Sequence, residues 1–187
     1  MNLSEAIHAR RATRSYEPHI VEDAQIHAFL RAAVQAPSAM NAQPWIFAIV
    51  QSTETLKRWS DRAKTMLLET MSTEPKAARH IDHLRDPSFN IFYDASTLIV
   101  IGVHARGTYS DADCWLAAQN LMLSATDAAL ATCPIGFALP LLNTRDVKDE
   151  IGIAQAGAAV AAIIVGYPRG EVPPVPRNEP RVSAWMR

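Results

Sequence analysis

The stretch APSAMNAQPWIFAIV, residues 36–50, joins a polar loop to an apolar strand. Its loop part is bracketed by two prolines and contains Ser38, Asn41 and Gln43, residue types that are common in turns. The part from Trp45 onward is rich in β-branched and aromatic residues and predicts a strand. The polar side chains suit a ligand with donor and acceptor groups, such as a heterocycle or a polyol. They equally suit hydrogen bonds to the loop's own backbone, and on the loop alone that second interpretation is the stronger one.

Apolar residues recur at helical spacing on both sides of this stretch. Residues 3–9, with Asn2 or Ser4 as N-cap, and residues 21–36 are predicted helices. The alanine-rich residues 111–133 predict the longest helix, which we expect to be central and closely packed. Further predicted elements are helices in residues 52–71, in part of residues 72–90 and in residues 143–150, and buried strands in residues 96–105 and 156–167.

The two later strands are almost unbroken apolar runs, which indicates burial on both faces. The predicted architecture is a small mixed central sheet surrounded by helices, in one α+β domain over residues 1–187. Residues 168–187, called the tail below, contain five of the 12 prolines, which exclude a helix or central strand until the last residues. Apolar residues such as Val182 and Trp185 argue against a disordered segment. We therefore expect the tail to extend over a surface, and a partner subunit is one candidate.

Charge and composition exclude several classes of partner. The 18 basic and 19 acidic side chains give no global field that would recruit nucleic acid or an anionic membrane. The longest apolar run is too short for a membrane-spanning helix, and no signal peptide is expected at the N-terminus. Cys114 and Cys133 have neither metal-ligand spacing nor a disulfide framework, so we expect buried free thiols in a reducing compartment. These features predict a cytoplasmic protein.

Three arginines lie close together in HARRATRSY, residues 8–16, and no acidic residue lies within this stretch. Guanidinium groups form paired hydrogen bonds with phosphate oxygens and stay charged at physiological pH. Arg10, Arg11 and Arg14 therefore predict a site for a phosphate or another anion, in preference to a solvated basic loop.

Other candidate sites are weaker. His80 and His83 have spacing that could bind a metal from one helix face, but a solvated helix is the preferred interpretation. The sequence has no dinucleotide-binding G-x-G-x-x-G motif, so a nicotinamide would be a transient substrate and not a resident cofactor. Phe92 or Phe137 could shape a substrate pocket, although most of the aromatic residues are expected in the core.

Together, RRATRSY and APSAMNAQPWIFAIV resemble the N-terminal signature of the FMN-dependent nitroreductase family. Downstream, FYDASTLIVI, CPIGFA and VGYPRGEVPPVPR follow in the family's order, so the resemblance extends over almost the whole chain. It implies a nitroreductase-like fold and an intertwined homodimer with FMN at the interface. It also implies a ping-pong reaction, in which hydride passes from NAD(P)H through flavin N5 to a nitroaromatic, a quinone or a similar acceptor. The cofactor would carry the chemistry, so no catalytic side chain is predicted.

The resemblance assigns the arginines to FMN. Arg10 and Arg11 resemble the pair that meets the phosphate and ribityl chain, and Arg14 resembles the cation at flavin N1 and the C2 carbonyl. Ala12 stands where the family usually has a serine, so one hydroxyl contact to the phosphate is absent here. A fixed cation near N1 would stabilise the reduced flavin and raise its potential.

The remaining cofactor residues are also implied by the resemblance. Residues of the polar loop would reach the FMN of the other protomer, residues 134–136 of CPIGFA would lie beside flavin N5, and a tail cation would close over the phosphate. They are Pro37, Ser38, Asn41 and Gln43 in the loop, Pro134, Ile135 and Gly136 beside N5, and Arg177 in the tail. Arg181 is an alternative tail cation, and Asn90 is a candidate for the pyrimidine edge.

Three alternatives stay open at this point. One is a specialised flavin enzyme on the same fold, such as a dehalogenase-like or azoline-oxidising relative. Another is a non-catalytic flavin- or nucleotide-binding sensor. The third is an anion-binding protein without flavin. The sequence does not decide between NADH and NADPH, nor does it identify the physiological acceptor.

Overall fold

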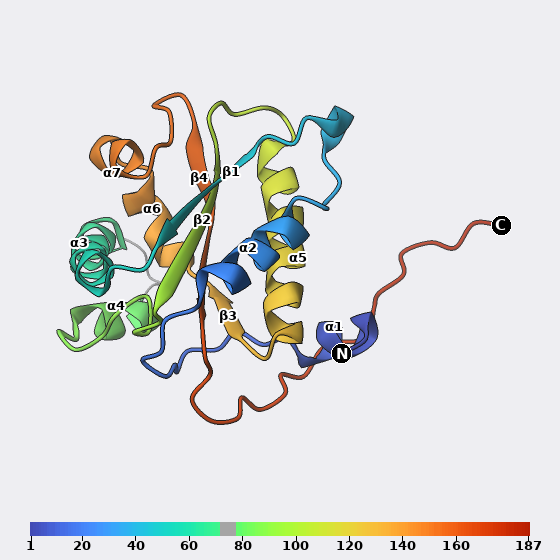
Figure 1. Ribbon diagram of the computed structural model, residues 1–187, viewed down its shortest axis with the longest axis horizontal. Helices are drawn as coiled ribbons and strands as arrows, with labels where there is room; N and C mark the ends of the chain where they lie inside the picture. The colour runs from blue at the N-terminus through green and yellow to red at the C-terminus, as the bar shows by residue number, and fades with distance from the viewer. Residues whose placement is uncertain (72–77) are drawn as a thin grey trace.

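The computed structural model describes residues 1–71 and 78–187 and has a four-stranded sheet at its centre (Figure 1). The strands are β1 (Trp45–Val50), β2 (Thr97–Val103), β3 (Ala131–Pro134) and β4 (Ala158–Gly166). Their order in the sheet is β1-β2-β4-β3, so β2 and β4 are central and β3 is an edge strand.

All three strand pairings are antiparallel. The α+β class and the small sheet surrounded by helices are confirmed, but the prediction of a mixed sheet is wrong for these four strands. The apolar runs of β2 and β4 suggested parallel neighbours because parallel strands are usually buried on both faces. Here helices cover both faces of an antiparallel sheet, which produces the same sequence pattern.

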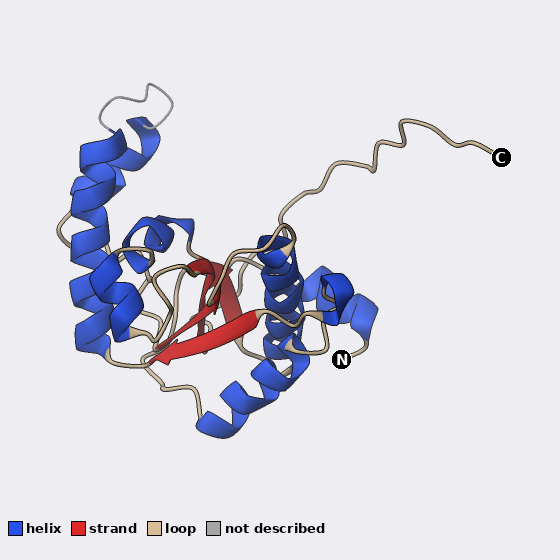
Figure 2. Ribbon diagram, turned by 90° about the horizontal axis from the view of Figure 1, so that it is seen from above, coloured by secondary structure: helices blue, strands red, loops and turns tan. Residues whose placement is uncertain are grey.

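The helices form two layers on the sheet (Figure 2). Their bounds are α1 Leu3–Ala9, α2 Asp23–Ala33, α3 Thr53–Met71, α4 Ala78–Arg85, α5 Ser110–Asp127, α6 Leu139–Leu142 and α7 Arg145–Glu150, with short 3-10 turns at Ala39–Asn41 and Gly136–Ala138. Helices α2 and α5 pack on one face, and α3 and α6 pack on the other. None of the helices in the described residues is both long and apolar enough to cross a membrane.

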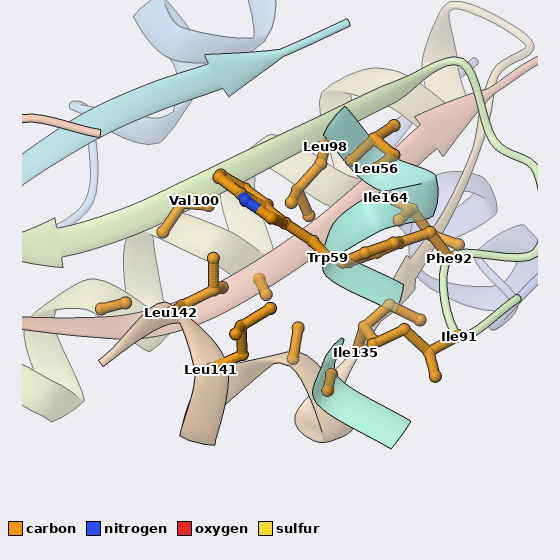
Figure 3. Close-up of a cluster of buried hydrophobic side chains, with 14 of the residues drawn as sticks. Leu56, Trp59, Ile91, Phe92, Leu98, Val100, Ile135, Leu141, Leu142 and Ile164 are labelled. Atoms are coloured by element: carbon orange, nitrogen blue, oxygen red, sulfur yellow. The ribbon is translucent and has the colours of Figure 1, made fainter. Parts of the chain in front are cut away.

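Alternate residues of β2 supply the two cores, as a two-residue strand period requires. Leu98 and Val100 face the α3 side, whereas Ile99 and Ile101 face α5. On the α3 side, the buried ring of Trp59 lies against the sheet among these leucine and valine side chains (Figure 3). One apolar strand therefore contributes side chains to both cores.

Two predictions about α5 are wrong, its C-terminal end and its rank as the longest helix. The helix was expected to continue to Cys133 and to be the longest, but it ends at Asp127, and its 18 residues are one fewer than the 19 of α3. Ala129 adopts a left-handed conformation with φ 58°, and the Leu130 N–H donates to the Ala125 carbonyl at 2.9 Å. This is the geometry that glycine usually provides at a helix C-terminus. Because alanine occupies the position, the sequence contained no stop signal, and the residues that follow form β3.

Both termini have simple local explanations. Asn2 caps α1 through a capping box with Glu5, which confirms one of the two predicted caps. The tail has no helix or strand after Pro168, which forms an isolated bridge with Tyr16, and its later residues extend away from the body of the molecule (Figures 1 and 2). The packing of the tail on a partner subunit stays a prediction.

Asn143 forms hydrogen bonds with the backbone of β4 next to an irregularity in its pairing with β2. The β2–β4 register shifts between Ile101 and Gly102. The side chain of Asn143 forms hydrogen bonds with both the N–H and the carbonyl of Ala159. Its Nδ2 donates to the Ala159 carbonyl at 2.9 Å, and its Oδ1 accepts from the Ala159 N–H at 3.1 Å. Nδ2 also donates to the Leu139 carbonyl at 2.9 Å, which fastens α6 to the sheet.

We expect Asn143→Ala to lower the free energy of unfolding by about 2–3 kcal/mol, because the substitution leaves the buried N–H and carbonyl of Ala159 without partners. Urea unfolding measures the loss. Asn178→Ala, in the exposed tail, is the control and should leave the unfolding midpoint unchanged. Equal midpoints for the two variants would contradict this role of Asn143.

Candidate functional site

Residues 10–14, called the arginine segment below, lie along the exposed edge of β3. Ala12 and Thr132 form a parallel bridge, and the Thr13 N–H donates to the Thr132 carbonyl at 3.1 Å. An edge strand offers unpaired backbone groups that a neighbouring segment can use. The pairing fixes the position of the arginines relative to residues that lie more than a hundred positions later in the chain.

Tyr16 closes the turn that contains Arg14. Its hydroxyl donates to the Thr13 carbonyl at 2.8 Å, and its ring lies so close to Gly166 that a Cβ there would be 2.8 Å from the ring. Burial raises the pKa of Tyr16 well above its usual range, so the phenol remains a neutral donor. Arg14 is therefore held at the tip of a short loop whose ends are both fastened.

Arg14 lies at the wall of a cavity of about 540 Å³, called the central cavity below. Residues 133–137 form one side of it, with Ile135 and Phe137 as apolar surfaces. Tyr93 lies on another side, and the Arg14 guanidinium carbon is 5.8 Å from the centroid of its ring. Apolar and aromatic walls with one fixed cation suit a flat, electron-rich ring system.

A smaller polar cavity of about 350 Å³ shares Arg14 and Tyr93 with the central cavity. Asn90 lines it, donates from Nδ2 to Asp94 Oδ1 at 2.8 Å and accepts the Phe92 N–H at 2.9 Å. The Asn90 side chain therefore supports its own turn, in which both Tyr93 and Asp94 have positive φ.

Two side chains of α3 form hydrogen bonds with the backbone of this turn and of the residues just before it. The buried Lys64 donates to the carbonyl of Phe89 at 2.8 Å, and Ser60 Oγ accepts the Ile91 N–H at 3.0 Å. These two contacts fix the side of the central cavity that contains Tyr93. No sequence pattern marks either residue, because each occupies what looks like an ordinary polar position of a helix.

Arg10 and Arg11 lie beside a third cavity of about 240 Å³, together with Pro168 and Gly170 from the start of the tail. The Arg11 guanidinium donates to the backbone carbonyls of His8 and Arg10, and its buried Nε has no hydrogen-bond partner. Within the part of the chain that the structure describes, Arg10, Arg11 and Arg14 form no ion pair. Three uncompensated guanidinium groups, one of them with an unsatisfied buried donor, fit an anionic ligand.

Cys133 lines the central cavity close to the arginine segment. Burial raises the pKa of its thiol, although Arg14 and Arg10 act in the opposite direction. The thiol is therefore neutral at physiological pH and does not act as a nucleophile. Cys114 is likewise a buried free thiol, as the sequence predicted, and burial raises its pKa to about 12.

The structure does not bring all the predicted site residues together. Arg14 and residues 134–136 line one cavity, and Arg10 and Arg11 lie nearby on the same segment. The polar loop lies at the opposite end of α5, where the Ala39 N–H donates to Asp113 Oδ1 at 3.1 Å (Figure 1). Because α5 has 18 residues, about 27 Å of helix separates that end from the arginine segment.

Arg177 is also absent from the lining of the central cavity of its own chain. It is exposed in the tail, where its guanidinium donates to the Pro176 carbonyl at 3.5 Å. Arg181 is also exposed in the tail. The loop residues Pro37, Ser38, Asn41 and Gln43 and the two tail arginines therefore do not reach the central cavity of their own chain.

His83 is a cavity residue that the sequence interpretation assigned to a solvated helix. It projects from α4 at the wall of the central cavity, 5.9 Å between ring centroids from Phe89. Helix periodicity alone could not place this exposed side chain, because the neighbouring wall comes from residues 133–137. In the described residues no group of His, Cys, Asp and Glu side chains is arranged to hold a metal ion.

The fold and the site define an α+β protein whose sheet edge presents cations beside a cavity for a flat anionic ligand. The family model described as Nitroreductase family matches residues 7–167, and the chain belongs to this family. The family resemblance seen in the sequence is therefore confirmed.

Individual relatives are more distant. The chain is similar to an Archaeoglobus fulgidus protein with the provisional name NADH dehydrogenase/NAD(P)H nitroreductase, at 27% identity over 168 residues, which cover 88% of this chain and 84% of the relative. It is also similar to the iodotyrosine deiodinase of Thermotoga neapolitana, at 29% identity over 154 residues and 80% of each chain. A nitroreductase with bound FMN from Desulfitobacterium hafniense has the same fold, with a TM-score of 0.84, 21% identity and 100% of both chains covered.

Proposed function

We propose that the protein is an FMN-dependent oxidoreductase that takes electrons from NAD(P)H and reduces a nitroaromatic, a quinone or a similar acceptor. The observation that carries the proposal is a set of three guanidinium groups on one segment, none with an acidic partner in the described chain. Arg14 lines the central cavity with its apolar and aromatic walls, and Arg10 and Arg11 line the smaller cavity farther along the same segment. Nitroreductases with bound FMN that share the fold support the identity of the ligand. The name of the Archaeoglobus relative supports NAD(P)H as the donor.

Different residues of the chain would bind different parts of FMN. Arg10 and Arg11 would neutralise a phosphate of about −1.5 to −2 charge. Arg14 would place a fixed positive charge against the ring system, and backbone groups of residues 134–136 would lie along its reacting edge. The neutral Cys133 and the apolar Ile135 would keep water from the buried side. Bound FMN would supply two-electron redox chemistry, which alternates between oxidation of NAD(P)H and reduction of the acceptor.

We propose that the working unit is a homodimer. The polar loop and the tail arginines do not reach the central cavity of their own chain, so a second copy is the natural source of both. Apolar side chains are also exposed on two helices, namely Leu3 and Ile7 on α1 and Trp115 and Leu116 on α5. In a homodimer, such a surface would be covered by the same surface of the partner.

The proposal is tested by adding excess FMN to the protein, desalting, and measuring retained flavin by its visible absorbance. We expect stoichiometric retention, bleaching by NADH or NADPH without oxygen, and return of the colour when a quinone or nitro compound is added. A colourless desalted protein would contradict FMN binding. Retained flavin that neither nucleotide bleaches would favour the non-catalytic sensor.

A reductive dehalogenase is the second candidate, and the similarity to iodotyrosine deiodinase over 80% of each chain favours it. The same preparation distinguishes the two activities. Release of iodide from 3-iodotyrosine by the dithionite-reduced protein, with slow turnover of nitro compounds and quinones, would favour the dehalogenase.

A further inference from the structure

The polar loop, residues 37–43, has an unusual backbone. Met40 and Asn41 both have φ 53°, and Gln43 has φ 45°, so three residues other than glycine are left-handed within four positions. Such a conformation is sterically unfavourable for residues other than glycine, with asparagine the most tolerant. A loop of this shape persists only where surrounding contacts hold it.

Some of these contacts lie inside the loop. Ser38 Oγ accepts the Gln43 N–H at 2.9 Å, and Gln43 Nε2 donates to Asn41 Oδ1 at 3.2 Å. The interpretation in which the polar side chains bond the loop's own backbone therefore holds for Ser38, whereas Asn41 and Gln43 pair through their side chains. These contacts close the loop on itself but do not fix its position on the molecule.

One contact fastens the loop to the rest of the protein. Across the described residues, the loop's single hydrogen bond to another element runs from the Ala39 N–H to Asp113 Oδ1, at 3.1 Å. Asp113 lies in the first turn of α5 and is 5% exposed. A carboxylate in so shielded a position accepts a stronger hydrogen bond than a neutral group would.

We propose that Asp113 is the positioning residue that holds the polar loop in its binding conformation before FMN arrives. The inference rests on the proposed function. Asp113 would touch neither cofactor nor substrate and would act through the backbone of Ala39. If the loop is already ordered, FMN binding does not have to supply the free energy of ordering it. Loss of the contact should therefore appear in cofactor affinity.

The test compares FMN dissociation constants, measured by quenching of flavin fluorescence. We expect Asp113→Ala to bind FMN about tenfold more weakly, which corresponds to about 1.4 kcal/mol. Asp113→Asn keeps an acceptor oxygen and should restore affinity to within about threefold of the wild type. Asp111→Ala is the matched control, because this exposed carboxylate lies in the same helical turn and pairs with Arg106 at 3.5 Å.

Ala39→Pro removes the same hydrogen bond from the donor side and leaves the buried helix untouched. Proline is compatible with this position, since Ser38 is extended at φ −137° and ψ 150° and Ala39 begins a 3-10 turn. We expect the same loss of FMN affinity as in Asp113→Ala, and this variant keeps the inference testable if Asp113→Ala does not fold.

The outcomes separate the inference from the proposed function. If the wild type binds FMN and both bond-removing variants bind it as tightly, the role of Asp113 is wrong. A lower urea midpoint with unchanged FMN affinity would show a purely structural contact and would also overturn the inference. A wild type that binds no FMN contradicts the proposed function itself.

Discussion

The double variant Arg10→Ala, Arg11→Ala is expected to bind FMN at least about a hundredfold more weakly than the wild type. Hydrogen bonds to charged groups contribute about 1.5–3 kcal/mol each, so the loss of two guanidinium groups removes about 3 kcal/mol or more. The effect should be large because neither arginine forms an ion pair in the described chain. Titration of FMN fluorescence at fixed ionic strength measures it.

The control for this variant must remove two positive charges from elsewhere. Arg58→Ala, Arg62→Ala does so on α3, where these residues pair with Glu150 and Asp146 on α7. We expect its FMN affinity to be close to that of the wild type. Equal weakening in the two double variants would mean that net charge, and not the arginine segment, governs binding.

The second large effect concerns stability. Gly157 precedes β4 where its backbone crosses the end of β2, and a Cβ there would overlap the Val103 carbonyl oxygen and lie 2.8 Å from the His104 carbonyl carbon. These obstacles are backbone atoms, which cannot move aside as a flexible side chain can. We expect Gly157→Ala to lower the free energy of unfolding by about 4 kcal/mol, at the upper end of what single substitutions cause.

Urea unfolding, or the yield of soluble protein if the variant fails to fold, measures this loss. Gly107→Ala is the matched control, because a Cβ at Gly107 meets nothing within 4 Å. If Gly157→Ala unfolded at the same urea concentration as Gly107→Ala, the close crossing of the two strands would be contradicted.

Local sequence patterns predicted most of the elements, because their causes are local. The Asn2 cap, the strand from Trp45 and the apolar run that forms β2 all follow from near neighbours. The end of α5 does not, since its stop depends on Ala129 adopting a conformation for which alanine carries no signal. The antiparallel orientation could not be predicted either, because burial on both faces depends on helices from elsewhere in the chain.

Some features of the site could likewise be predicted from local sequence, and others could not. The arginine cluster could be predicted, because three like charges within five residues repel one another unless an anion is nearby. Its meeting with residues 134–136 depends on the bridge between Ala12 and Thr132, which no local pattern contains. His83 and Asp113 were missed because each acts on a segment that is distant in sequence.

The pairing of residues 15–17 with residues 167–169 has a consequence for the synthesis of the protein. The Glu17 N–H donates to the Tyr167 carbonyl at 2.9 Å, and the Arg169 N–H donates to the Ser15 carbonyl at 3.0 Å. A ribosome releases residues 15–17 long before residues 167 and 169 exist, so the earlier segment must wait for partners that are made much later. Until those residues have been synthesised, the cationic turn around Arg14 lacks half of its anchorage, and a nascent chain would hold the proposed cofactor poorly.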